Sequence, residues 1–373
     1  MLSYVGFVSL GLPDTILGAS WPAIRSELRL PMAAAGSAVM VTMVGIVSSS
    51  AASGWVRARF GTATVLIVST LLAAIALGMG SLAQSWSVFL VAALIAGLGG
   101  GAIDASLNHL VARRHSARHM SWLHACWGVG ASLTPMLVAW LLKRGLTWRR
   151  PYAILAGVEL ALALAFLANR HGWSDDGPST PSTKPAVAHG RPRGAMAASV
   201  ALFAFYGGVE ASAGLWATSF LTMTRGASPA TAGAMVAVYW GALTIGRFVL
   251  GALVHRLGPL RLLRFCTRGA VVALGLWALP GTPLWFCGGA LALLGFALAP
   301  VYPVAMHDTA SRFEEAGARL VGYQVAACSV GVAVLPGLVG VIGAWTSPLV
   351  IPPVVMALAV GVVTLEVRRR SRA

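Results

Sequence analysis

Long runs of apolar residues follow one another along almost the whole chain, separated by short polar or glycine-containing stretches. A helix needs about 20 mostly apolar residues to cross the hydrocarbon core of a bilayer. The pattern therefore predicts an all-α membrane protein with twelve transmembrane helices. They are expected at residues 4–24, 32–54, 63–83, 87–111, 121–142, 151–169, 197–222, 229–254, 261–280, 284–308, 318–343 and 347–366.

One long polar segment interrupts this pattern. Residues 170–196 contain Asp175, Asp176 and four prolines, together with Ser and Thr, and show no apolar periodicity. Such a composition is typical of a linker. The segment predicts a cytoplasmic linker between an N-terminal six-helix bundle, residues 1–169, and a C-terminal six-helix bundle, residues 197–373.

The composition agrees with a membrane protein. Only 10% of the residues are charged and 57% are hydrophobic, whereas a soluble domain has about 25% charged residues. The net charge of +16 would indicate nucleic-acid binding in a soluble protein. Here the basic residues lie in short stretches between apolar runs, so we expect the lipid bilayer and no nucleic acid as the partner.

The distribution of basic residues predicts an orientation. Nineteen of the 27 Lys and Arg residues lie on one side of the predicted helices, and basic residues are enriched on the cytoplasmic side of membrane proteins. We therefore expect both termini and the linker in the cytoplasm of a cell (inner) membrane. The basic cluster Lys143–Arg150 lies on the other side, and the rule does not explain it.

The two halves of the chain share sequence features. The stretches Gly54–Gly61 and Gly251–Gly258 both read G-x-x-x-x-R-x-G, with Arg59 and Arg256 as their arginines, and lie 197 residues apart. Gly130 and Pro135 have counterparts in Gly331 and Pro336, 201 residues further on. Parallel six-helix repeats are an architecture of secondary transporters.

The first of these stretches resembles the loop signature of the major facilitator superfamily, Gly-x-x-x-Asp-Arg-x-Gly-Arg-Arg, and the second resembles its copy in the other half. Ala58 and His255 replace the acid of that pattern, and Thr62-Ala63 replaces the basic pair. The resemblance implies the twelve-helix fold. It implies a gating or structural role for Gly54, Arg59, Gly61, Gly251, Arg256 and Gly258. Arg247 joins this group as a basic residue deep inside a predicted helix.

Five further stretches resemble the fucose-permease and glucose-permease branch of the superfamily. They are Leu10–Asp14, Gly101–Asn108, His124–Gly130, Tyr206–Glu210 and Ala299–Pro303. Members resembling these are proton-coupled sugar transporters, and many relatives export or import other compounds. In this superfamily, the helices equivalent to the first, fourth and seventh line a central cavity.

Asp14, Asp104 and Glu210 lie well inside predicted helices. Ionisable groups inside a membrane are costly and mark functional sites. Burial in a medium of low dielectric constant disfavours the charged form of a carboxyl group, so such groups can bind and release the protons that coupling requires. The alternative is that they pair with buried partners and hold helices together, with Arg247 the obvious partner. Asp14 could also lie at the outer mouth or cap a helix after Pro13.

A second set of residues has the chemistry of a sugar site. Aromatic faces pack against the apolar side of a sugar ring, and amides, carboxylates and hydroxyls bind its hydroxyl groups. The candidates are Asn108, His124, Trp127, Tyr206, Tyr302 and Gln324. For any single aromatic residue, lipid-facing packing is the alternative.

One predicted helix face combines features of a binding cavity with features of close helix packing. Asn108 shares a face with Asp104, and Gly97 and Gly101 continue that face. An acid and an amide on a face of small residues favour a cavity wall. Close helix packing through the glycines is the alternative.

These features predict a secondary active transporter, coupled to protons or Na⁺, that moves a small polar solute, a sugar by resemblance, by alternating access. The alternative is an efflux antiporter for amphipathic compounds or organic anions. No nucleophile–base pair, metal-ligand cluster or P-loop has convincing spacing, so we expect no enzyme activity, no cofactor and no metal. A channel and an accessory or sensor protein remain open, and we expect a monomer.

Overall fold

The computed structural model describes residues 2–114, 117–170, 193–312 and 314–371, and every regular element in these ranges is a helix. The first five helices are α1 (Leu2–Leu28), α2 (Ala34–Leu82), α3 (Trp86–Arg114), α4 (Ala117–Lys143) and α5 (Arg149–Ala168). The others are α6 (Arg193–Arg225), α7 (Pro229–Leu257), α8 (Pro259–Ala278), α9 (Leu284–Leu298), α10 (Val301–Arg312), α11 (Glu314–Trp345), the 3₁₀ turn η2 (Pro348–Val350) and α12 (Ile351–Ser371). Most of the predicted linker, 171–192, lies outside the described residues.

Two regions differ from the predicted helices in the way their segments are joined. The runs predicted at 32–54 and 63–83 form one 49-residue helix, α2, which is interrupted by the non-helical backbone of Gly61. The run predicted at 284–308 is divided between α9 and α10. Ten described segments are long and apolar enough to cross a membrane, so the chain is a multi-pass helical membrane protein.

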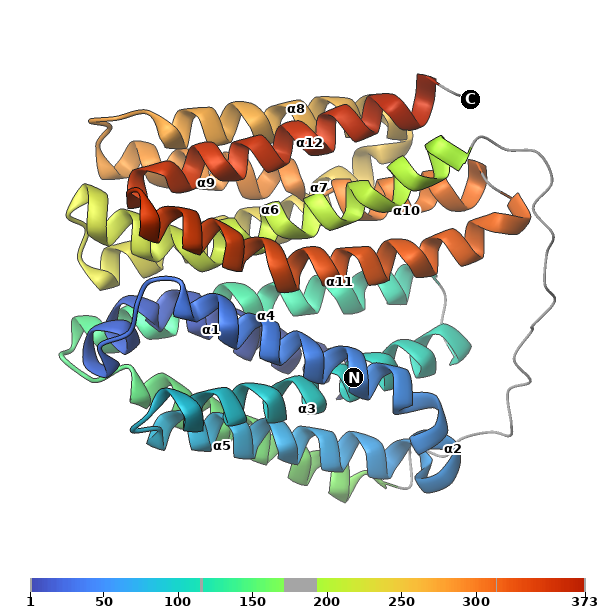
Figure 1. Ribbon diagram of the computed structural model, residues 1–373. Helices are drawn as coiled ribbons and strands as arrows, with labels where there is room; N and C mark the ends of the chain where they lie inside the picture. The colour runs from blue at the N-terminus through green and yellow to red at the C-terminus, as the bar shows by residue number, and fades with distance from the viewer. Residues whose placement is uncertain (1, 115–116, 171–192, 313, 372–373) are drawn as a thin grey trace. The chain divides into compact units, whose positions relative to one another are not determined.

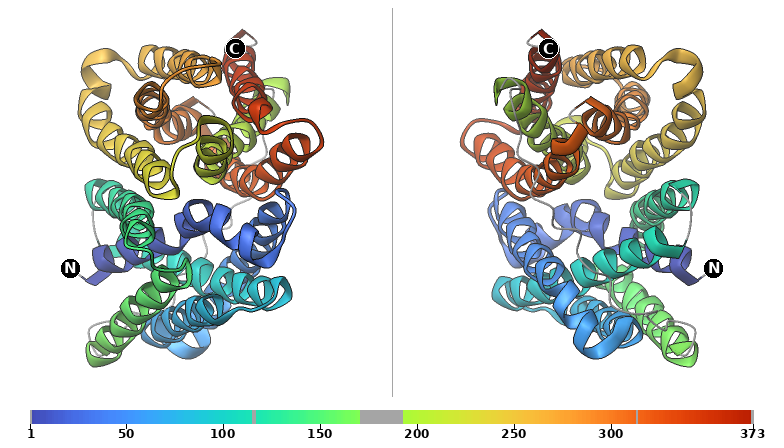
Figure 2. Two further views of the ribbon diagram at one scale, coloured as in Figure 1. Left: turned by 90° about the vertical axis from the view of Figure 1, so that its left-hand side faces the viewer. Right: turned by 90° about the vertical axis from the view of Figure 1, so that its right-hand side faces the viewer.

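The described residues form two compact units. Unit 1 contains α1 to α5 together with residues 228–237 at the start of α7, and unit 2 contains α6, the rest of α7 and α8 to α12. Within unit 1, α1 packs along α4 and α2 packs along α3 (Figure 1). Within unit 2, α6 packs against α11 and α12 (Figure 1). Figure 2 views the helices of each unit nearly end-on and shows that they share a common direction, with individual tilts.

The repeated glycine stretches adopt the same backbone conformation in both units. Gly61 has φ 80° and Gly258 has φ 79°, and these two residues lie 197 positions apart. A positive φ is unfavourable for residues that carry a Cβ atom and is readily adopted by glycine. Each glycine therefore interrupts the chain at the same point of the repeat, between two consecutive helical segments.

In unit 1, α1 and α4 cross with their backbones in close contact. A Cβ atom on Gly11 would lie 2.0 Å from the carbonyl oxygen of Trp127, and one on Gly130 would lie 2.0 Å from the carbonyl oxygen of Val8. Real Cβ atoms do not approach oxygen so closely. Glycine at both positions is therefore a requirement of this crossing.

In unit 2, α6 and α11 cross in the same register. A Cβ atom on Gly331 would lie 1.9 Å from the carbonyl oxygen of Ala204, and one on Gly207 would lie 2.8 Å from that of Cys328. The same two contacts occur in unit 1. Residues of α6 correspond to residues of α1 with numbers 196 lower, and residues of α11 correspond to residues of α4 with numbers 201 lower. The repeat seen in the sequence is therefore a repeat of helix packing.

A second crossing follows the same rule. In unit 1, a Cβ atom on Gly97 of α3 would lie 2.1 Å from the carbonyl oxygen of Thr42 on α2. In unit 2, one on Gly295 of α9 would lie 2.2 Å from the carbonyl oxygen of Tyr239 on α7. The displacements are 197 and 198 residues, so positions on these helices can be compared between the units one by one.

Candidate functional site

In unit 2, a cluster of polar side chains surrounds Glu210. Tyr206 and Glu210 lie one turn apart on α6, and the Tyr206 hydroxyl donates a hydrogen bond to Oε2 of Glu210. The guanidinium of Arg247 on α7 lies 3.5 Å from the same oxygen. The Tyr239 hydroxyl donates to the backbone carbonyl of Glu210 at 3.0 Å. Two polar groups, one from α6 and one from α7, thus meet at the carboxylate of Glu210, and a third binds the backbone of the same residue.

This cluster is mostly buried but not sealed. The side chains of Arg247 and Glu210 are 19% and 15% exposed. A carboxylate and a guanidinium compensate each other's charge in a medium of low dielectric constant, and breaking such a pair leaves one uncompensated charge. Tyr302 extends the cluster, because its ring centroid lies 5.9 Å from that of Tyr206. The arrangement offers a titratable acid and a cation beside two aromatic faces.

In unit 1, Asp14 on α1 is bound by an indole. Nε1 of Trp127, on α4, donates a hydrogen bond to Oδ2 of Asp14 at 2.7 Å. Asp14 is exposed and Trp127 is half-buried. The indole N–H is a neutral donor, so this contact orients the carboxyl group without neutralising its charge.

Asp104 on α3 also has a neutral partner. Nδ2 of Asn108, one turn further along the helix, donates to Oδ1 of Asp104 at 2.9 Å. Both side chains are half-buried. Unit 1 therefore holds two carboxyl groups, each bound by a neutral hydrogen-bond donor.

The glycines on the face of Asp104 serve close packing. Gly97 lies against the carbonyl oxygen of Thr42 on α2, and a Cβ atom on Gly101 would lie 2.4 Å from the carbonyl oxygen of Ile46 on the same helix. These residues form the crossing of α3 with α2, as the packing alternative proposed. The acid and the amide lie on the same helix beside this crossing and remain partly accessible.

Two of the candidate ligands are not found in either polar cluster: Gln324 is buried elsewhere, and the side chain of His124 is not described. Gln324 on α11 is 0% exposed, and its amide donates to the hydroxyls of Ser199 and Thr309 at 2.8 and 2.7 Å. Its side chain is thus engaged inside unit 2, and we do not carry it into the proposed binding set. His124 belongs to α4, and its side chain lies outside the described residues.

Apart from Arg247, the residues expected to have gating or structural roles are glycines and exposed arginines. Gly61 and Gly258 have the positive φ values given above, whereas a Cβ atom on Gly54 or Gly251 would meet nothing within 4 Å. Arg59 and Arg256 are exposed, and the Arg59 guanidinium lies 5.8 Å from the ring centroid of Phe60. Arg247 belongs to neither group, because it pairs with Glu210.

Sequence reasoning missed two buried acids. Glu159, on α5 of unit 1, and Glu366, on α12 of unit 2, are each 1% exposed. Their signal was available, since each is an acidic residue within a predicted helix, 151–169 for Glu159 and 347–366 for Glu366. Among the described residues, no group of three or more His, Cys, Asp and Glu side chains is placed to hold a metal ion.

These features define a class of protein: a multi-pass helical membrane protein with an internal repeat and ionisable clusters inside its spans. A family model described as the Major Facilitator Superfamily matches residues 4–336, and the chain belongs to this family. A relative from Haemophilus influenzae, described as a putative metabolite transport protein, is 27% identical over 345 residues, which cover 83% of this chain and 82% of the relative. The protein is therefore a transporter and not an enzyme.

Solved structures with low sequence identity share the fold. A bacterial homolog of the human lysosomal transporter Spinster superposes with a TM-score of 0.77 at 12% sequence identity. The superposition covers 99% of this chain and 94% of the homolog's chain. A D-xylose–proton symporter superposes with a TM-score of 0.76 at 16% identity and covers 100% of this chain and 96% of its own. The resemblance to the fucose-permease and glucose-permease branch stays a prediction.

Proposed function

We propose that the protein is a proton-coupled secondary active transporter that moves a small polar solute by alternating access, with sugars as the first class to test. The observation that carries the proposal is the contact of Glu210 with both Arg247 and Tyr206. A titratable acid shares one oxygen with a cation and a hydroxyl donor. Its protonation state therefore decides what those two groups can bind.

The proposed coupling follows from this geometry. When Glu210 takes up a proton, it loses its charge, and its attraction to the Arg247 guanidinium weakens. Arg247 and the Tyr206 hydroxyl then become available to oxygen atoms of the solute. Release of the proton restores the ion pair and expels the solute. Asp104 and Asp14 are the proposed coupling groups of unit 1.

Each unit offers proposed solute contacts of its own. In unit 1, Trp127 offers an aromatic face and Asn108 an amide, and both side chains are partly accessible. In unit 2, Tyr302 offers a partly accessible aromatic face and Tyr206, which is 2% exposed, offers a hydroxyl. His124 remains in the set on its sequence position alone. Aromatic faces combined with a few polar groups are typical of sites for small polar ligands.

The proposed topology has twelve spans. At 1.5 Å per residue, the 49 residues of α2 extend over about 73 Å, more than twice the thickness of the hydrocarbon core, about 30 Å. We therefore count α2 as two spans divided at Gly61, and α9 with α10 as one. The proposed bundles are residues 1–169 and 197–373, joined by a cytoplasmic linker at 170–196, in a monomer of the inner membrane with both termini in the cytoplasm.

The test is uptake by the purified protein in proteoliposomes under an imposed pH gradient. We expect wild type to accumulate its solute only with the gradient, and Glu210→Gln to equilibrate the solute without accumulating it. Full gradient-driven accumulation by Glu210→Gln would show that Glu210 is not the coupling site. A sodium gradient at constant pH, run in parallel, separates the two candidate ions.

The second candidate is antiport of an organic anion, and the exposed fraction of Arg247 favours it. A guanidinium binds carboxylates in a bidentate manner, and in this protein a solute carboxylate could replace Glu210 as its partner. In this case a deletion strain becomes sensitive to toxic anions while its sugar uptake is unchanged. Sugar accumulation in proteoliposomes would exclude this candidate as the main activity.

A further inference from the structure

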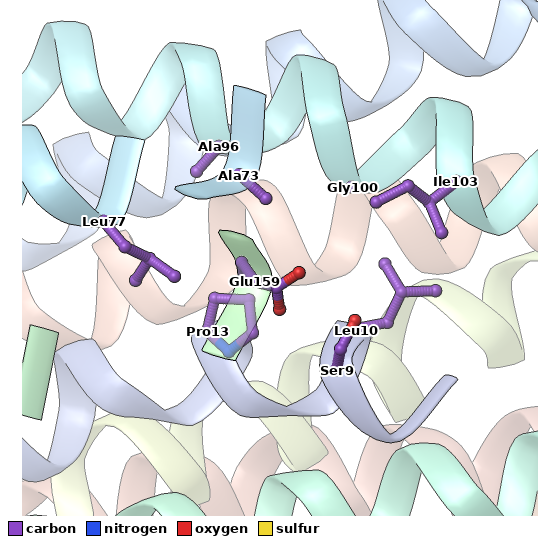
Figure 3. A pocket seen from close by; sticks show the side chains of 9 residues that line it. All are labelled: Ser9, Leu10, Pro13, Ala73, Leu77, Ala96, Gly100, Ile103 and Glu159. Carbon is purple, nitrogen blue, oxygen red and sulfur yellow. The ribbon is translucent and has the colours of Figure 1, made fainter. Parts of the chain in front are cut away.

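Unit 1 contains a small cavity lined by residues of α1, α2, α3 and α5 (Figure 3). Its volume is about 20 Å³, and a cavity of about 10–15 Å³ or more can hold one water molecule. Seven of the nine lining residues have no polar side-chain atom; the other two are Ser9 and Glu159. Figure 3 shows the carboxyl group of Glu159 directed into the space among these side chains.

The carboxyl group of Glu159 has an unsatisfied oxygen. Oε2 has no hydrogen-bond partner among the described residues, although the residue is 1% exposed. An isolated carboxylate in an apolar medium is far costlier than the neutral acid. No other residue that lines the cavity is ionisable. On the lining helices, the ionisable residues closest along the chain to those that line the cavity are Asp14 on α1, Asp104 on α3 and Tyr152 on α5, while residues 62–82 of α2 contain none.

Ser9 is the second polar residue of the cavity wall. Its hydroxyl donates a hydrogen bond to the carbonyl of Gly6 at 3.1 Å. A hydroxyl has one proton to donate. With that proton directed to Gly6, the Ser9 oxygen offers the cavity an acceptor, and a carboxyl group can donate to an acceptor only when it is protonated.

A further acceptor is available beside the cavity. Pro13 has no N–H group, so the carbonyl of Ser9, four residues earlier, lacks its helical donor. Together with Oε2 of Glu159, this carbonyl offers acceptor sites to a water molecule in the cavity. Buried waters make about three hydrogen bonds to polar groups that are otherwise unsatisfied.

The equivalent place in unit 2 is closed. The displacement of 202 residues between the first residues of α5 and α12 pairs Glu159 with Gly361, and that of 196 residues between α1 and α6 pairs Ser9 with Phe205. The ring of Phe205 lies against Gly361, 2.5 Å from where its Cβ atom would be. The fold therefore packs this place without a carboxyl group, and the cavity is a specific feature of unit 1.

We propose that Glu159 and Ser9 form an additional proton-binding site inside unit 1, in which Glu159 carries a proton and hydrogen-bonds one internal water molecule. The site is separate from Asp14 and Asp104, whose described partners are Trp127 and Asn108. It follows from the cavity and its contacts, and it does not depend on which solute the protein carries.

Infrared difference spectroscopy on the full-length protein in detergent tests the proton. At neutral pH, the spectrum of wild type minus Glu159→Gln should contain the carbonyl band of a protonated carboxylic acid, shifted in D₂O. Glu27→Gln is the matched control, because Glu27 is ion-paired with Arg149 and its removal should delete carboxylate bands only. If Glu159→Gln also deletes carboxylate bands only, Glu159 is ionised and the proposal is wrong.

Two further variants test the water and the energetics. Ala96→Val adds two carbons to the cavity wall, so it should expel the water and move the Glu159 carbonyl band to higher frequency; an unchanged band would exclude the water. The melting temperature of wild type should fall relative to Glu159→Gln as the pH rises, because stability that depends on a bound proton is lost when the proton leaves. A constant difference between the two proteins at all pH values would exclude titration of Glu159.

Discussion

The two units repeat the same helix packing but differ in their charges. The displacement of 196 residues pairs Asp14 of unit 1 with Glu210 of unit 2, and the displacement of 197 residues pairs Ser50 with Arg247. Ser50 donates a hydrogen bond to the carbonyl of Gly101 at 3.0 Å, whereas Arg247 forms an ion pair with Glu210. An acid occupies the same position in both units, and among the side chains that the structure describes only unit 2 places a cation beside it.

At a second pair of equivalent positions, unit 1 has an acid and unit 2 has a neutral residue. The displacement of 198 residues pairs Asp104 of unit 1 with Tyr302 of unit 2. Unit 1 thus has two acids with neutral donors, Trp127 and Asn108, whereas unit 2 has one acid with a cation and two tyrosines. The comparison indicates that backbone packing fixes where the polar side chains lie, whereas the residue types at these positions differ between the two units. Under the proposed function, unit 1 would bind protons and unit 2 would exchange a proton for a solute contact.

The largest effect is expected where the two units are the same. Gly130→Ala and Gly331→Ala each direct a methyl group at a backbone oxygen that cannot move away, so each should destabilise its helix crossing by about 3 kcal/mol or more. Gly157→Ala in unit 1 and Gly289→Ala in unit 2 are matched controls, because a Cβ atom there meets nothing within 4 Å. Folded yield and melting temperature in detergent measure the result. Equal stability of all four variants would contradict the packing repeat.

The next largest effect should occur in unit 2 alone. Arg247→Met leaves Glu210 without its counter-charge and should cost about 3 kcal/mol, at the low end for a buried pair because both side chains are partly accessible. Adding Glu210→Gln should restore stability, measured as melting temperature in a double-mutant cycle. Additive losses would show that the two residues are not coupled.

A smaller effect on stability, but a large one on coupling, is expected for the acids of unit 1. Asp14→Asn and Asp104→Asn keep the shape of the side chain and remove its titration. Each should leave solute exchange in proteoliposomes intact and reduce accumulation under a pH gradient to the level without a gradient. If either variant accumulates solute as wild type does, that acid takes no part in coupling.

The smallest effect concerns the indole contact in unit 1. Trp127→Phe removes the hydrogen bond to Asp14 and keeps most of the aromatic surface, and the expected loss of stability is about 1 kcal/mol. The same change should alter the pH profile of uptake, because Asp14 loses a donor that favours its charged form. Trp122→Phe, at an exposed position on the same helix, is the control. An unchanged pH profile would show that the contact has no influence on Asp14.

Several elements could be predicted from the sequence because they depend on local chemistry. Apolar length predicted the helices closely; the run at 151–169, for example, corresponds to α5 at Arg149–Ala168. The spacing of the repeated glycines predicted equivalent places in the two halves, and Gly61 and Gly258 have positive φ values of 80° and 79°. The join between two spans in α2 could not be predicted, because apolar length does not report whether a helix is interrupted by one residue or by a loop.

The candidate site could be predicted only in part. The sequence identified Asp14, Asp104 and Glu210 as acids inside spans, since charged residues in apolar runs stand out. It did not reveal which neutral or charged group each acid contacts. It also assigned Gln324 to ligand binding, although this amide is buried among Ser199 and Thr309. A helix that is hydrophobic on all sides carries no pattern that separates lipid-facing, buried and accessible positions.

The sequence by itself determined that this chain spans a membrane with two related halves, because a run of apolar residues and a repeated motif are properties of local order along the chain. Only the tertiary structure decided that Arg247 pairs with Glu210, that Trp127 binds Asp14 and that Glu159 faces a cavity with Ser9. These contacts join residues on different helices, and their geometry depends on which backbones approach closely. Glycines at the helix crossings set that approach, so the packing, and not the residue types alone, determines which polar groups meet.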